Sequence, residues 1–151
     1  MPDRKPPAPP EPMFWRGVAW SLRVQLAVIH ALFGLTVLSR QNIPLLFKGY
    51  ASFDDAFPFW WWGAASMLVA ALLLIVPTRL PWGLLTTFLS MTLSFAIGAT
   101  FVLGGGLLPA ATLFFGFGFG AGALFTRALW LYAVRVRWFQ QHVLERGVKG
   151  G

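Results

Sequence analysis

The sequence predicts an all-α membrane protein, built as an antiparallel bundle of four transmembrane helices. The first observation is its composition: 57% of the residues are hydrophobic and only 11% are charged, whereas a soluble domain carries about 25% charged residues. The second is that four long apolar runs are separated by short segments rich in proline and glycine. The third is that the basic residues flank these runs, as they do in helices that cross a bilayer. A chain of 151 residues is expected to form one domain.

The two ends of the chain are predicted to lie outside the packed domain. Residues 1–13 contain six prolines and cannot build a core, so we expect a disordered cytoplasmic tail. A PxxP pattern there leaves open a role as a ligand for a partner domain that binds proline-rich segments. Residues 147–151 are expected to form a short flexible tail.

The transmembrane domain is predicted to cover residues 14–146. Its four spans are expected at about 18–38, 59–76, 82–103 and 108–126. Each span has roughly 18–22 residues, which is enough to cross about 30 Å of hydrocarbon. Short connections predict that the second and third spans, and the third and fourth, are antiparallel neighbours. Residues 127–146 are expected to continue the fourth helix into the cytoplasm.

The longest connection, residues 39–58, is unusually apolar. We expect this segment to lie in the membrane interface, with a short amphipathic helix after Ser52. Three consecutive tryptophans follow it, and they are expected at the headgroup zone, which tryptophan favours.

The orientation is predicted from the distribution of Lys and Arg. Ten of the twelve basic residues lie in the two terminal flanks and in the connection between the second and third spans. The opposite side carries only Arg40 and Lys48, which Asp54 and Asp55 partly offset. The positive-inside rule therefore predicts a multi-pass protein of the cell inner membrane, with both termini in the cytoplasm.

The fourth span contains the run FFGFGFGAGALF, residues 114–125. A lone strand in lipid would leave its backbone groups unpaired, so we predict a helix. At about 100° per residue, Gly116 and Gly120 share one face, and Gly118 and Gly122 share a nearly opposite face. Small residues let transmembrane helices approach closely, which predicts two grooves for packing. Either both grooves serve the fold, or one serves association with another copy. The residues predicted to pack helices are Gly34, Gly83, Gly98, Gly116, Gly118, Gly120 and Gly122.

Ionisable residues are scarce in the spans: none contains Asp, Glu or Lys, and the chain has no cysteine and two histidines. Proton-coupled transporters generally titrate an intramembrane carboxylate, and zinc enzymes need clusters of His and acid. We therefore predict no catalytic, cofactor-binding or metal-binding residue. His30 lies near the bilayer centre, where it either bonds to a neighbouring helix or serves a polar or pH-sensitive path. The residues of that candidate path are His30, Thr87, Ser90 and Ser94.

Four arginines are predicted to contact lipid headgroups at the cytoplasmic side. These are Arg23, Arg127, Arg135 and Arg137. Long basic side chains near the ends of spans reach to the interface and attract anionic lipid. A bilayer with anionic lipid is therefore an expected partner, and nucleic acid is not.

The predicted function is that of a small non-enzymatic membrane protein that acts by helix association. It would be an accessory or assembly subunit, or a self-oligomer. Two alternatives stay open: a phage-type holin that forms membrane lesions, and a small channel or transporter with a polar path near His30.

Overall fold

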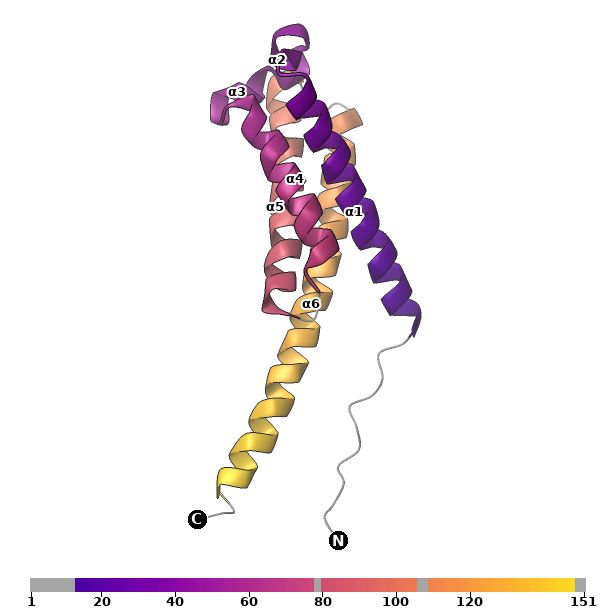
Figure 1. Ribbon diagram of the computed structural model, residues 1–151, viewed down its shortest axis with the longest axis vertical. Helices are drawn as coiled ribbons and strands as arrows, with labels where there is room; N and C mark the ends of the chain where they lie inside the picture. Colours follow the sequence, from indigo (N-terminus) through magenta and orange to yellow (C-terminus); the bar gives the residue numbers. More distant parts are fainter. Residues whose placement is uncertain (1–12, 78–79, 106–108, 149–151) are drawn as a thin grey trace.

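The computed structural model describes residues 13–77, 80–105 and 109–148, except for the side chains of residues 13–15, 48, 135 and 137–148. Within these ranges the chain is helical and has no strand, so the all-α prediction is confirmed. Four long helices form one elongated bundle (Figure 1). They are α1 (Met13–Ser39), α4 (Phe59–Ile75), α5 (Pro81–Gly105) and α6 (Pro109–Val148). Three short elements cover one end: α2 (Ile43–Leu46), η1 (Lys48–Tyr50) and α3 (Ala51–Ala56).

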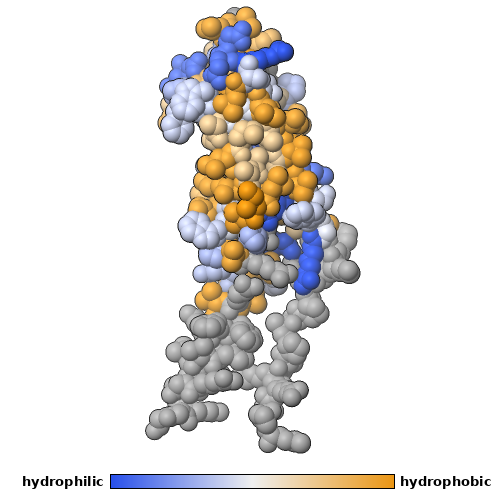
Figure 2. All heavy atoms as spheres, viewed as in Figure 1, coloured by the Kyte–Doolittle hydropathy of each residue, from blue (hydrophilic) through white to orange (hydrophobic). Residues whose placement is uncertain are grey.

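Three of the long helices have segments that are long and apolar enough to cross a membrane. These segments are Arg16–Ser39, Pro81–Gly105 and Pro109–Val134. Helix α4 is apolar but has only 17 residues, or about 25 Å of helix. Orange, hydrophobic side chains cover much of the side of the bundle in Figure 2. Large apolar side chains such as those of Leu32, Leu74 and Leu113 are exposed, as expected for a bundle surrounded by lipid.

The long helices are arranged as two pairs. Helix α1 packs mainly against α4, and α5 packs mainly against α6, while contacts between the pairs are fewer. The α5–α6 neighbours agree with the sequence prediction. Helices α4 and α5 touch less than their short connection predicts, because α4 packs more extensively on α1.

Two glycines bring α1 and α4 together. A Cβ atom added to Gly34 would lie 2.9 Å from the carbonyl oxygen of Gly63, and one added to Gly63 would lie 3.1 Å from the carbonyl oxygen of Gly34. The two backbones therefore cross in direct contact. Small residues permit such a crossing, and any side chain at either position would push the helices apart.

In the contact between α5 and α6, each helix packs a phenylalanine ring against a glycine of the other. A Cβ at Gly98 of α5 would lie 2.9 Å from the ring of Phe115, and one at Gly118 of α6 would lie 3.0 Å from the ring of Phe95. The two rings also face each other, with centroids 6.1 Å apart. The alternating phenylalanines and glycines thus lie on a helix, as predicted. Phe115 contributes a ring that packs against α5, and Gly118 leaves space for a ring of α5.

The connection between α1 and α4 is folded onto the bundle. It contains the helix expected after Ser52, which is α3, but it also contributes to the core: Phe53 is fully buried. The ring of Phe53 lies 5.1 to 6.2 Å from five other aromatic rings. These rings belong to Phe33, Tyr50, Phe59, Trp62 and Phe101. Burial raises the pKa of the Tyr50 phenol.

Two hydrogen bonds fix the corner between α3 and α4. The indole Nε1 of Trp62 donates to the carbonyl of Phe53 over 3.1 Å, and the backbone N–H of Phe59 donates to Oδ1 of Asp54 over 2.7 Å. An acid at a helix start also complements the helix dipole. Trp62 is buried, whereas Trp60 and Trp61 are exposed.

The predicted tails fall mostly outside the described residues. Residues 1–12 and 149–151 are not described, and α6 continues as a helix to Val148.

Candidate functional site

A buried polar cluster joins the two helix pairs. His30 of α1 lies against α5, where its Nε2 atom is 3.0 Å from Oγ of Ser90 and 3.5 Å from Oγ of Ser94. All three residues are at most 1% exposed. Ser90 and Ser94 are four residues apart, so they present their hydroxyls on one face of the helix. One ring nitrogen thereby connects α1 to α5 inside the bundle.

Thr87 lies on the same helix, about one turn before Ser90, and is also buried. Its hydroxyl donates within its own helix, to the carbonyls of Gly83 over 3.1 Å and Leu84 over 2.9 Å. The structure therefore brings three of the four residues of the predicted polar path into one hydrogen-bonded group. Thr87 satisfies its hydroxyl separately.

Among the described residues, two buried polar atoms near the middle of the spans have no hydrogen-bond partner: Nδ1 of His30 and Oγ of Ser66. Most buried polar atoms in proteins do have one. Ser66 belongs to α4 and is fully buried, yet it was not among the predicted path residues. Ser66 lies three residues after Gly63 and four before Ala70, so these small, buried residues share one face of α4. This spacing is the sequence signal that could have identified Ser66.

Arg23 lies nearer the other end of α1 and is only 5% exposed. Its guanidinium Nη2 donates to the carbonyl of Val76, directly after the end of α4. The last carbonyls of a helix lack partners within the helix, and a cation is favourable there. This placement differs from the expected contact with lipid headgroups, because the side chain is directed into the bundle.

The other predicted arginines lie on α6. Arg127 is half-buried. The side chains of Arg135 and Arg137 fall outside the part of the chain that the structure describes.

The glycines of residues 114–125 have different surroundings. Gly118 and Gly122 face α5, and a Cβ at Gly122 would lie 3.3 Å from the sulfur of Met91. Gly120 faces α1, since its Cβ would lie 3.4 Å from Cδ1 of Leu22. Gly116 is exposed and would meet nothing within 4 Å. Gly83, at the start of α5, is buried.

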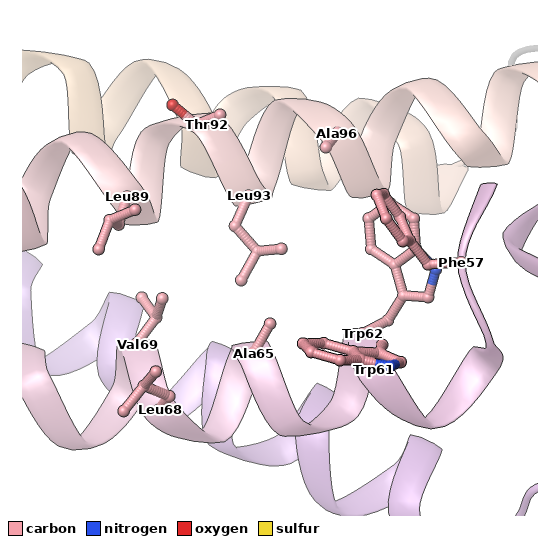
Figure 3. Close-up of a pocket in the computed structure, with 10 residues that line it drawn as sticks. All are labelled: Phe57, Trp61, Trp62, Ala65, Leu68, Val69, Leu89, Thr92, Leu93 and Ala96. Atoms are coloured by element: carbon pink, nitrogen blue, oxygen red, sulfur yellow. The ribbon is translucent and has the colours of Figure 1, made fainter.

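A second feature is an apolar groove between α4 and α5, with a volume of about 430 Å³. Figure 3 shows its two walls facing each other, with aromatic side chains at one end. Its lining residues are Phe57, Trp61, Trp62, Ala65, Leu68, Val69, Leu89, Thr92, Leu93 and Ala96. Sequence reasoning missed this groove because it depends on how far apart two apolar helices lie.

The structure thus contains two candidate features: a hydrogen-bonded group of His30, Ser90 and Ser94 inside the bundle, and an apolar groove between α4 and α5. Among the described residues no group of three or more His, Cys, Asp or Glu side chains could hold a metal ion. No protein-family model, curated protein or solved structure matches the chain.

Proposed function

We propose that this is a small non-enzymatic protein of the inner membrane, which acts by associating through α6 with a second copy or with another membrane protein. The observation that carries this proposal is Gly116, an open glycine on the lipid-facing side of a membrane-spanning segment. Gly34, Gly98 and Gly118, in contrast, have their space filled by neighbouring helices. Exposed Thr112 and Ala123 lie on the same side of α6 as Gly116. Small residues at such a face allow another helix to approach closely.

The experiment that tests association through this face of α6 replaces Gly116 with leucine. A Cβ atom there meets nothing within 4 Å, so the bundle should remain intact while the face is blocked. We expect the apparent dissociation constant, measured by energy transfer between labelled copies in liposomes, to rise about tenfold. Gly17→Leu is the matched control, because a Cβ atom at Gly17 also meets nothing within 4 Å.

If native copies do not associate, the same labelled variants are used to capture a partner from the membranes of the source cell. Equal association, or equal partner recovery, by the native chain and Gly116→Leu would show that this face is not the interface.

We further propose four spans, with both termini in the cytoplasm. The apolar character of α4 supports a fourth crossing, since a span of about 25 Å can be accommodated by local thinning of the bilayer. The starts of α1 and α5 and the far end of α6 lie toward one end of the bundle, and α2 and α3 lie at the other (Figure 1). The more basic end is therefore assigned to the cytoplasm.

Reporter fusions test this topology. Fusions at both termini and in the connection after α4 should report a cytoplasmic location, and a fusion after Asn42 should report the opposite side. A C-terminal fusion on the periplasmic side would contradict the orientation.

One observation favours a second candidate function, the passage of a solute or proton. The group formed by His30, Ser90 and Ser94 places polar atoms between helices near the middle of the spans. If this group forms a path, His30→Ala should change the flux or its pH dependence in liposomes. An unchanged flux would contradict a path through this group, whose role would then be only to join α1 to α5.

A further inference from the structure

We propose that the groove between α4 and α5 binds one hydrocarbon chain of a membrane lipid. The chain would lie along the two helices, with the polar end of the lipid near Phe57 and Trp61. Binding at this groove is separate from the proposed association through α6, because the groove lies between other helices.

The chemistry of the walls selects an apolar ligand. None of the ten lining residues is charged. Apart from the indole N–H groups of the two tryptophans, the only polar side-chain group among them is the hydroxyl of Thr92. In Figure 3 the hydroxyl of Thr92 is directed away from the space between the helices. The indole N–H of Trp62 is already donated to the carbonyl of Phe53. A polar ligand would thus lose its hydration without gaining partners, which is unfavourable.

The shape of the groove suits a single hydrocarbon chain. Its α4 wall runs from Trp61 to Val69, which is roughly 12 Å of helix axis, and the facing α5 wall runs from Leu89 to Ala96, which is roughly 10 Å. The apolar space of about 430 Å³ is therefore elongated along the two helices. A hydrocarbon chain fits such a space lengthwise.

The groove is continuous with the surface that faces lipid. Its rim residues Trp61, Leu68 and Leu89 are 53%, 59% and 37% exposed. A chain from the surrounding bilayer can therefore enter sideways. An empty groove would leave its lining atoms without van der Waals contacts, and a chain supplies them.

The aromatic end of the groove indicates the direction of the lipid. Phe57 and Trp61 are exposed and lie beside the α3–α4 corner. Tryptophan is enriched where headgroups meet hydrocarbon. The bound chain would begin at this level and run towards Leu68 and Leu89, joining a helix of one pair to a helix of the other.

The test uses a phospholipid with a photoactivatable diazirine in its acyl chain, reconstituted with the full-length protein. After illumination, peptide mass spectrometry maps the labelled positions. We expect label to concentrate on Leu68, Leu89 and Leu93. Label distributed evenly over the exposed leucines, including Leu32 and Leu113, would overturn the proposal.

Variants make the same test sharper. Ala96→Phe fills the groove and should lower the labelling of Leu68 about fivefold, equivalent to roughly 1 kcal/mol of binding. Ala99→Phe is the control, because Ala99 lies on the same helix but is exposed outside the groove. Equal labelling of Leu68 in both variants would contradict the proposal, and so would crosslinks between copies at Leu68 in place of lipid.

Two further measurements separate lipid binding from misfolding and from association. Ala96→Leu replaces Ala96→Phe if the larger side chain prevents folding, and the map of the native protein decides independently of either variant. Gly116→Leu should leave the labelling unchanged, so that failure of the association proposal and failure of the lipid proposal are distinguishable.

Discussion

Gly34→Leu will force α1 and α4 apart and destabilise the whole bundle. The Cβ atom alone would lie 2.7 Å from Cγ of Met67 and 2.9 Å from the carbonyl oxygen of Gly63. A flexible methionine can move, but a backbone carbonyl cannot move without shifting α4. We expect a loss of at least about 3 kcal/mol in the free energy of unfolding, the upper part of the range for overpacked sites.

Unfolding of the purified protein in mixed micelles, followed by circular dichroism, measures this loss. Gly17→Leu on the same helix is the matched control and should unfold like the native protein, because nothing lies within 4 Å of its Cβ position. Equal stability of the two variants would show that α1 and α4 do not cross at Gly34.

Phe53→Ala will detach the connection that covers the end of the bundle. Phe53 is 0% exposed and lies among five aromatic rings, so its removal leaves a cavity that its neighbours cannot fill. Comparable losses of a buried phenylalanine cost about 3–5 kcal/mol. The expected result is a lower thermal midpoint, together with faster proteolysis between α1 and α4.

The control for this prediction is Phe47→Ala, in the same connection. Phe47 is 59% exposed, so its replacement should leave the thermal midpoint and the proteolysis rate close to native values. If Phe53→Ala behaves like Phe47→Ala, the connection is not part of the core.

Much of the fold follows from the sequence because lipid leaves few choices. Long apolar runs must pair their backbone groups internally, and helices do this locally. The spacing of Ala27, His30 and Gly34 by three and four residues puts them on one face of a helix, and all three are buried. The helical interpretation of residues 114–125 holds for the same reason.

The remaining features depend on relations between helices that no local pattern contains. Trp62 looks like its neighbours in the tryptophan run, but the fold turns it toward Phe53. Arg23 has the position of an interfacial arginine, yet the end of α4 supplies its acceptor, the carbonyl of Val76. The choice of Ser90 and Ser94 as partners of His30 likewise depends on how the two helix pairs lie against each other.

We propose that the protein acts by association and does not open the membrane. The most direct measurement is the membrane potential of a bacterial host, followed with a dye after induced expression of the native chain and of Gly116→Leu at matched levels. We predict an undisturbed potential for both proteins. Abrupt depolarisation by the native chain would contradict the claim and would show instead a channel or a lesion-forming oligomer.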